Sequence, residues 1–287
     1  MSKIILGTVQ FGLDYGINNT LGKIPIEEIH QILDFAYSKG ILTLDTASGY
    51  GDSEEIIGTY LAKNPNKRFE IITKINSSET SLEEQLKESL RKLKLNKIEV
   101  LMLHSFELYE KFKSQITAFC QKNKGKNFNE LGVSVYTNDE IETIISDPNI
   151  NRIQSPFNLL DNEMKRGEKY AEIKSNGKVV DTRSVFLQGL FFKDTNTLPA
   201  DLEQLREPLE KLKRIAASES LSMEELAMGY ALSMKFIDNV LIGVDSLDQF
   251  KKNINVLSNS ISKELVEEIN SISIENTNLL NPSLWKM

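Results

Sequence analysis

Four ionisable side chains stand where apolar runs of this sequence end. Asp45 closes the run that begins at Ile41, and Tyr50 follows in the glycine-rich loop LDTASGYGDSE. Lys74 and His104 end the next two apolar runs. If these runs are parallel strands of one barrel, their carboxyl ends meet at the same edge and bring the four side chains together. A phenol, an ammonium, a carboxylate and an imidazole at one edge form a set that can transfer a proton.

The proton chemistry of this set follows from the charges of its members. A free tyrosine has a pKa of about 10, and a nearby ammonium lowers that pKa by favouring the phenolate. Lys74 would therefore tune Tyr50 as a proton donor, and Asp45 would keep Lys74 charged. His104 would orient a carbonyl oxygen. An alkoxide develops when a hydride is added to a carbonyl carbon. No side chain supplies a hydride, so the set implies a nicotinamide cofactor.

Other interpretations of the same residues remain open. A strand-end Asp often caps the next turn, a loop Tyr is often a surface aromatic, and a strand-end His is often a hydrogen-bonded structural residue. Lys74 could also form a Schiff base, as in a barrel aldolase or isomerase. A third alternative is a cofactor-binding barrel that serves as a regulatory subunit without a dedicated substrate.

The elements that would position these residues alternate along the chain. Eight apolar, β-branched runs are continuous, as is typical of strands buried on both faces. They lie at residues 3–9, 41–47, 69–75, 98–105, 129–135, 152–158, 179–186 and 239–244. Helical patterns separate them, for example at 24–40 and 81–93, and Ser222 with Glu225 forms a capping-box pattern. The alternation predicts an α/β fold, a (β/α)8 TIM barrel, as a single domain over 1–287.

The main structural alternative is an open doubly wound sheet. The first run is not followed by a G-x-G-x-x-G pattern, which disfavours a dinucleotide-binding Rossmann fold. The longest interval between runs precedes the eighth and predicts a loop and an extra helix within 187–218, the helix at 202–218.

Composition narrows the class of protein. The 287 residues carry a formal net charge of −7, which makes nucleic acid and anionic membranes poor partners. Cys120 is the only cysteine, so the chain has neither an intrachain disulfide nor a cysteine-rich metal site, and no metal is expected. The sequence has no run of about 18 apolar residues. We therefore expect a cytoplasmic protein whose partner is a small molecule.

Together these stretches resemble the aldo/keto reductase family, in particular its short bacterial members. In order along the chain they are LGTVQFG, LDTASGYGDSE, TK, SLRKLKLNKIEVLMLH, GVSVY, QSPFNLLD and IGVDSLDQFKKN. The resemblance covers nearly the whole chain. It implies a (β/α)8 barrel that binds NADP(H) without a Rossmann motif and reduces an aldehyde or ketone, such as a sugar-like or anionic carbonyl compound. It also implies that Asp45, Tyr50, Lys74 and His104 are the catalytic tetrad.

The resemblance also assigns a cofactor site and a substrate site. The implied cofactor-binding residues are Gly7, Thr8, Ser134, Gln154, Arg183, Gly243, Asp245, Gln249 and Asn253. The implied substrate residues are Phe11, Phe157 and Trp285, the last in a tail, 275–287, expected to fold over the barrel mouth.

The sequence departs from the family pattern in three stretches. Val135 stands where an Asn is common, and Arg183 where a Tyr often stacks on the nicotinamide. Arg183 could stack its guanidinium on that ring, face the pyrophosphate, bind an anionic substrate or form a structural ion pair. Asp245 and Gln249 stand in the stretch where Lys or Arg usually binds the 2′-phosphate of NADPH. A carboxylate repels a phosphate and accepts hydrogen bonds from ribose hydroxyls, so NAD(H) is an alternative cofactor.

Overall fold

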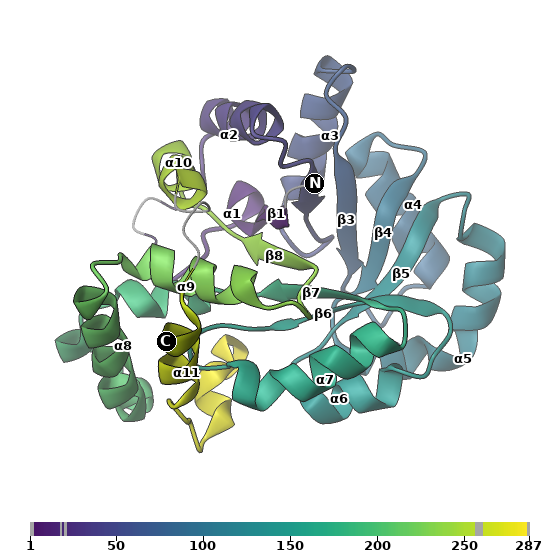
Figure 1. Ribbon diagram of the computed structural model, residues 1–287. Helices are drawn as coiled ribbons and strands as arrows, with labels where there is room; N and C mark the ends of the chain where they lie inside the picture. The colour runs from purple at the N-terminus through teal and green to yellow at the C-terminus, as the bar shows by residue number, and fades with distance from the viewer. Residues whose placement is uncertain (1–2, 18, 20–21, 256–260, 286–287) are drawn as a thin grey trace.

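Eight parallel strands form a closed barrel in the computed structural model of this chain, which describes residues 3–17, 19, 22–255 and 261–285. The strands follow one another around the barrel in sequence order, and β1 and β8 pair to close it (Figure 1). They are β1 (Ile4–Gly7), β2 (Thr43–Asp45), β3 (Glu70–Ile75), β4 (Ile98–Leu103), β5 (Phe128–Ser134), β6 (Ile150–Pro156), β7 (Val179–Arg183) and β8 (Asn239–Ile242). The predicted (β/α)8 barrel is confirmed.

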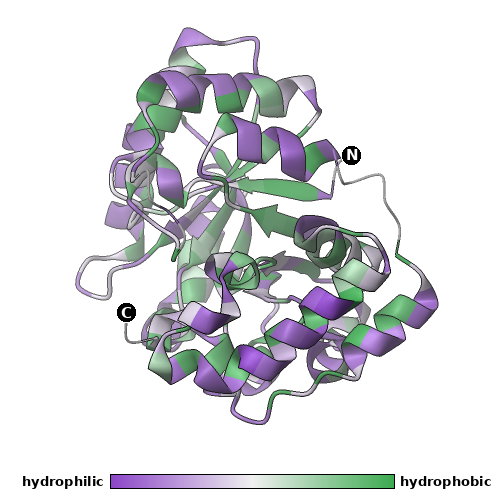
Figure 2. Ribbon diagram, turned by 90° about the vertical axis from the view of Figure 1, so that its left-hand side faces the viewer, coloured by the Kyte–Doolittle hydropathy of each residue, from purple (hydrophilic) through white to green (hydrophobic). Residues whose placement is uncertain are grey.

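Helices surround the barrel. They are α1 (Val9–Gly12), α2 (Ile26–Ser38), α3 (Ser53–Lys63), α4 (Leu82–Leu93), α5 (Phe106–Asn123), α6 (Asn138–Ile144), α7 (Glu163–Ser175), α8 (Arg206–Ser218), α9 (Met223–Ser233), α10 (Leu247–Asn255) and α11 (Lys263–Asn270). The strands are mostly green in Figure 2, whereas the helices around them alternate green and purple. The helices therefore pack an apolar face on the barrel and present a polar face to water.

Capping residues decide where several helices begin. Ser81 accepts a hydrogen bond from the backbone N–H of Glu84, whose side chain accepts one from Ser81 N in return. Ser222 and Glu225 form the same reciprocal pair at the start of α9, as their spacing predicted. Each cap satisfies backbone donors that the first helical turn leaves unpaired, which contributes about 1 kcal/mol.

The strand register directs the chemistry-bearing side chains into the barrel. Asp45 pairs with Ile72, and Lys74 pairs with Met102. Paired residues of neighbouring strands point to the same face of a sheet. Ile72 and Met102 belong to a small apolar cluster apart from the main core, whose members are Ile5, Ile72, Val100 and Met102. Asp45 and Lys74 therefore point into the barrel. They lie near its carboxyl end, next to this apolar cluster.

The segment between β7 and β8 is long, as predicted. It contains the 3₁₀ helices η1 (Leu187–Phe192), η2 (Thr195–Thr197) and η3 (Ala200–Leu205) before α8. The helix expected at 202–218 is thus divided between η3 and α8. Ser184, Leu187 and Gln188 have positive φ angles of 61°, 47° and 53°. Non-glycine residues adopt this conformation at a cost of about 1–3 kcal/mol each, and such residues concentrate at ligand sites.

The last described residues form two short 3₁₀ helices, η5 (Thr277–Leu280) and η6 (Pro282–Leu284). In Figure 1 they lie beside α11 and the start of α7. Trp285 Nε1 donates a hydrogen bond to the carbonyl oxygen of Leu279 at 3.0 Å. Within the described part of the chain, none of the helices has both the length and the apolar composition needed to span a membrane.

Candidate active site

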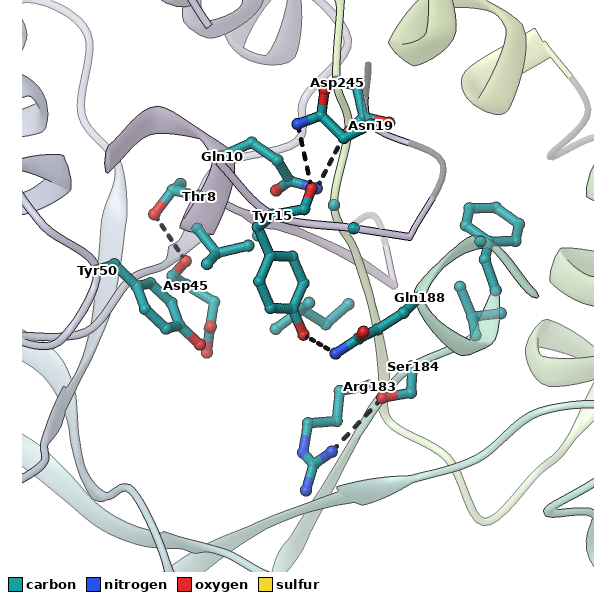
Figure 3. Close-up of a pocket in the computed structure, with 18 of the residues that line it drawn as sticks. Thr8, Gln10, Tyr15, Asn19, Asp45, Tyr50, Arg183, Ser184, Gln188 and Asp245 are labelled. Atoms are coloured by element: carbon teal, nitrogen blue, oxygen red, sulfur yellow. Dashed lines mark hydrogen bonds between the residues drawn. The ribbon is translucent and has the colours of Figure 1, made fainter. Parts of the chain in front are cut away.

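A cavity of about 460 Å³ opens at the carboxyl end of the barrel (Figure 3). Its volume falls in the range of small-molecule sites, roughly 300–1,000 Å³. All of the predicted cofactor-binding residues line it, together with the predicted catalytic residues Asp45, Tyr50 and His104. The cofactor-binding residues are Gly7, Thr8, Ser134, Gln154, Arg183, Gly243, Asp245, Gln249 and Asn253.

A buried ion pair lies beneath this cavity. Lys74 Nζ donates to Asp45 Oδ1 and, at 3.2 Å, to the carbonyl oxygen of Thr46. Gln154 Nε2 donates to the second carboxylate oxygen of Asp45 at 2.8 Å. Both charged side chains are at most 2% exposed. Burial lowers the pKa of Lys74, and the charge of Asp45 opposes this shift. Lys74 does not itself line the cavity, so it acts from behind Asp45 and Tyr50.

Tyr50 stands between this ion pair and His104. Its ring centroid lies 5.3 Å from Lys74 Nζ and 5.7 Å from the centroid of the His104 ring, at an interplanar angle of 79°. Burial and then the carboxylate of Asp45 raise the pKa of Tyr50 well above its ordinary value, and Arg183 opposes them. The expected net lowering of this pKa by the nearby ammonium of Lys74 is not seen, because burial and the carboxylate of Asp45 raise the pKa more. At neutral pH Tyr50 is a protonated phenol, as an ordinary tyrosine also is.

Glycines hold the Tyr50 loop against α1. A Cβ atom on Gly12 would lie 1.8 Å from the carbonyl oxygen of Tyr50, and one on Gly51 would lie 2.4 Å from the carbonyl oxygen of Gly12. Gly51 also has a φ of 55°, in the left-handed region that glycine tolerates without strain. Thr8 Oγ1 donates to the carbonyl oxygen of Asp45 at 2.9 Å. Close backbone packing therefore fixes the position of the Tyr50 backbone against α1.

His104 is neutral in this environment. Its backbone N–H donates to the carbonyl oxygen of Ile75 at 2.9 Å, which continues the β3–β4 ladder to the rim of the cavity. Burial, together with the cations Lys74 and Arg183, lowers the pKa of His104 to about 3. A neutral imidazole carries one N–H donor, which suits it to orient a carbonyl oxygen.

This shift predicts a pH dependence of stability. The unfolded chain, in which a His has a pKa of about 6.5, binds more protons than the folded chain between that pH and about 3. The wild type should therefore lose stability as pH falls through this window, and a His104→Gln variant should lose less. Denaturant midpoints at about pH 7 and pH 4.5 measure the difference. Equal losses in the two proteins would contradict the placement of His104.

Arg183 is the only Lys or Arg among the described residues that line the cavity. Its guanidinium carbon lies 4.1 Å from the ring centroid of Tyr136, a cation–π stack. Nη2 donates to the carbonyl oxygen of Val135 at 3.1 Å and Nη1 to Ser184 Oγ at 3.5 Å. Val135, which replaces the common Asn, is fully buried. Arg183 thus has no carboxylate partner in these contacts, which disfavours a structural ion pair.

Gln10 and Asn253, which line one end of the cavity, each have a buried polar atom without a hydrogen-bond partner among the described residues. The two atoms are Gln10 Oε1 and Asn253 Nδ2. A buried polar group is ordinarily hydrogen-bonded, so each of these atoms indicates a ligand that completes it. At the other end Ser134 and Gln154 pair in the β5–β6 register. Polar groups at both ends fit an extended nicotinamide dinucleotide.

Among the lining residues that sequence reasoning missed are Gln10, Tyr15, Tyr136 and Gln188. Gln188 Nε2 donates to Tyr15 Oη at 2.5 Å, so a residue following α1 meets the β7–α8 segment across the cavity (Figure 3). The positive φ of Gln188 aims it there. The only signal in the sequence was position, because Gln10 and Tyr15 lie in the segment after the first strand and Tyr136 lies in the segment after the fifth.

The structure places the three expected substrate residues elsewhere. Phe11 is fully buried in the main core, because α1 turns its ring away from the cavity. Phe157 is also fully buried and stacks on Tyr230, with centroids 5.4 Å apart. Trp285 is half-buried beside Leu279 and does not line the cavity. The first two rings cannot contact a substrate in this arrangement. The described part of the tail 275–287 likewise contributes no lining residue.

Comparison with known proteins decides the family. The family model described as the Aldo/keto reductase family matches residues 3–274. The chain belongs to the aldo/keto reductase family. Carbonyl reduction is the general chemistry of such oxidoreductases, and the barrel and the cavity at its carboxyl end agree with membership.

Relatives of this aldo/keto reductase are distant. It is 26% identical over 266 residues to a Bacillus subtilis (strain 168) protein named "Uncharacterized oxidoreductase YqkF", with 83% of each chain covered. It is 24% identical over 308 residues to the "NADH-specific methylglyoxal reductase" of Escherichia coli (strain K12), with 91% of each covered. The solved holo form of an aldo-keto reductase from Bacillus halodurans superposes with a TM-score of 0.70 at 22% identity, covering 95% of this chain and 92% of that one. This last likeness concerns the fold alone.

Proposed function

We propose that this protein reduces an aldehyde or ketone to the alcohol with NADH or NADPH as the reductant. The observation that carries the proposal is the position of the Tyr50 phenol at the cavity wall, with the Asp45–Lys74 ion pair behind it and the imidazole of His104 beside it. This arrangement suits the protonation of a carbonyl oxygen.

Each residue has a separate role in the proposed reaction. The nicotinamide supplies the hydride that reduces the carbonyl carbon. Tyr50 gives its phenolic proton to the carbonyl oxygen as negative charge develops there. His104 donates an N–H to that oxygen and orients it, and the cation of Lys74 stabilises the phenolate that remains. Asp45 keeps Lys74 charged and in place. Water later returns the proton to Tyr50.

Arg183 points to the character of the substrate. A cavity whose described lining has this one cation, stacked on Tyr136 and bound to a backbone carbonyl, is suited to a carbonyl compound that also carries an anionic group. The same positive charge disfavours the oxidised, cationic nicotinamide, and so favours the reductive direction.

The aldolase alternative is weakened by the contacts of Lys74. A Schiff-base lysine must present a free amine to the cavity. Lys74 Nζ is instead bound to Asp45 and to the carbonyl oxygen of Thr46, and the side chain is 1% exposed. The regulatory alternative is disfavoured by the complete set of proton-transfer groups at the cavity.

The proposal is tested with purified protein, a deuterated reductant and a panel of aldehydes, ketones and 2-oxo acids. We expect deuterium to transfer stereospecifically from C4 of the nicotinamide to the carbonyl carbon, as followed by mass spectrometry of the alcohol. Borohydride trapping of a carbonyl adduct on Lys74, with no deuterium transfer from the cofactor, would replace the reductase with the aldolase.

A further inference from the structure

Gln10 lies beside Asp245 at one end of the cavity (Figure 3), and its amide is also close to Gly243. It belongs to α1, and it was not among the residues that sequence reasoning assigned to the cofactor. Gln10 Nε2 donates to Asp245 Oδ1 at 3.3 Å. A carboxylate only accepts hydrogen bonds, which fixes the amide with Nε2 toward Asp245 and Oε1 away from it. Oε1 is then a buried acceptor without a partner among the described residues.

The other contacts of this end hold the arrangement in place. The backbone N–H of Asp245 donates to Gln249 Oε1 at 2.5 Å, which ties the loop after β8 to the first turn of α10. A Cβ atom at position 243 would lie 3.0 Å from Gln10 Nε2 and 3.1 Å from Oε1. A glycine at position 243 therefore allows the Gln10 amide to keep its present position. Asp245 is half-buried and lines the cavity.

The charges near this end oppose a phosphate. Gln10 and Asp245 present two acceptors, which require O–H or N–H donors from a ligand. Lys251 and Lys252 are the nearby cations in sequence, but both are exposed and neither lines the cavity. Arg183 lies at the far side of the cavity, stacked beside β5. A dianionic phosphate here would face the carboxylate of Asp245 with no cation of the described lining beside it.

We propose that Gln10 and Asp245 together bind the free 2′-hydroxyl of an adenosine ribose and thereby make this protein select NADH over NADPH. The inference rests on the proposed function, because it places the dinucleotide in the same cavity. The 2′-hydroxyl donates a hydrogen bond to the carboxylate of Asp245. The neighbouring ribose hydroxyl or the adenine amine donates a hydrogen bond to Gln10 Oε1. Gln10 acts both as a ligand and as a positioning residue, because its Nε2 orients the carboxylate.

The test uses calorimetric titration with ADP-ribose and with 2′-phospho-ADP-ribose, which lack the nicotinamide ring and so report on this end alone. We expect the wild type to bind ADP-ribose at least about tenfold more tightly. Gln10→Met keeps the length of the side chain and removes both polar atoms. It should weaken ADP-ribose binding by about tenfold and leave the weak binding of the phosphorylated ligand unchanged.

A matched control and a second variant keep the result interpretable. Gln121→Met makes the same change on the exposed face of α5 and should alter neither affinity. Asp245→Ser removes the repulsion and should tighten binding of 2′-phospho-ADP-ribose, so it tests the proposal even if Gln10→Met does not fold.

Three outcomes would overturn the inference. Tighter binding of the phosphorylated ligand by the wild type would remove the selection for NADH and leave the proposed reductase intact. Equal losses for both ligands in Gln10→Met would show that Gln10 only supports the fold. Binding of neither ligand by folded protein would overturn both proposals. Conversely, tight binding of ADP-ribose without deuterium transfer from NADH would overturn the proposed reaction alone.

Discussion

Replacing Tyr50 with Phe should lower kcat for carbonyl reduction by about 10²–10⁴-fold, the usual contribution of a positioned general acid. The change removes one oxygen and keeps the ring, which the Gly12 and Gly51 contacts hold through the backbone. The loss should fall on kcat, because the phenol acts on the developing alkoxide and not on the bound dinucleotide. Steady-state kinetics with the best carbonyl of the panel measures it.

A matched control separates the chemistry from the removal of a hydroxyl. Tyr37→Phe removes a phenolic oxygen that donates to the carbonyl oxygen of Asn66 on the protein surface, and kcat should not change. Titration with NADH should give the same Kd for Tyr50→Phe as for the wild type. A Tyr50→Phe variant with wild-type kcat would show that the proton comes from elsewhere, and the role of Tyr50 would have to be abandoned.

Replacing Lys74 with Met should affect stability and activity together. It leaves the carboxylate of Asp45 buried with Gln154 as its remaining side-chain donor. Breaking a buried ion pair from one side costs about 3–5 kcal/mol of unfolding free energy. Activity should also be lost, because no cation remains behind Tyr50 to stabilise the phenolate. Denaturant unfolding and steady-state kinetics measure the two effects on the same preparation.

The double variant Lys74→Met/Asp45→Asn tells the two effects apart. Removal of the second charge should restore much of the unfolding free energy, because the uncompensated carboxylate is gone. It should not restore kcat. If the double variant is as unstable as Lys74→Met, packing of the lysine stem and not its charge accounts for the loss.

The barrel could be read from the sequence because buried parallel strands form continuous apolar runs. Each of the eight expected runs overlaps a strand, although the boundaries differ. The second run, read as 41–47, is a strand only over Thr43–Asp45. A strand ends where backbone pairing stops, and apolar composition continues into the buried residues on either side, such as Ile41 and Ala47.

The site could be read only where strand position alone determines it. Asp45 and Lys74 are placed by the ends of their strands, which the runs reveal. The pairing of Gln10 with Asp245 joins residues 235 positions apart, and no local pattern marks it. Phe11 was assigned to the wrong surface, because the sequence does not say to which side a one-turn helix directs its rings. The pKa of Tyr50 depends on burial, which is likewise a tertiary property.

The hydrogen bond from Gln154 to Asp45 crosses the barrel from β6 to β2 and has a kinetic consequence. Asp45 is also bound to β3 through Lys74, and β1 closes against β8 through Ile4 and Val240. Such long-range pairings form slowly, because the loops between them lose entropy before the contacts are made. A partly formed barrel does not yet hold the proton donor in its position at the cavity. Refolding chains should therefore regain helical signal first and turnover last, when the ring closes.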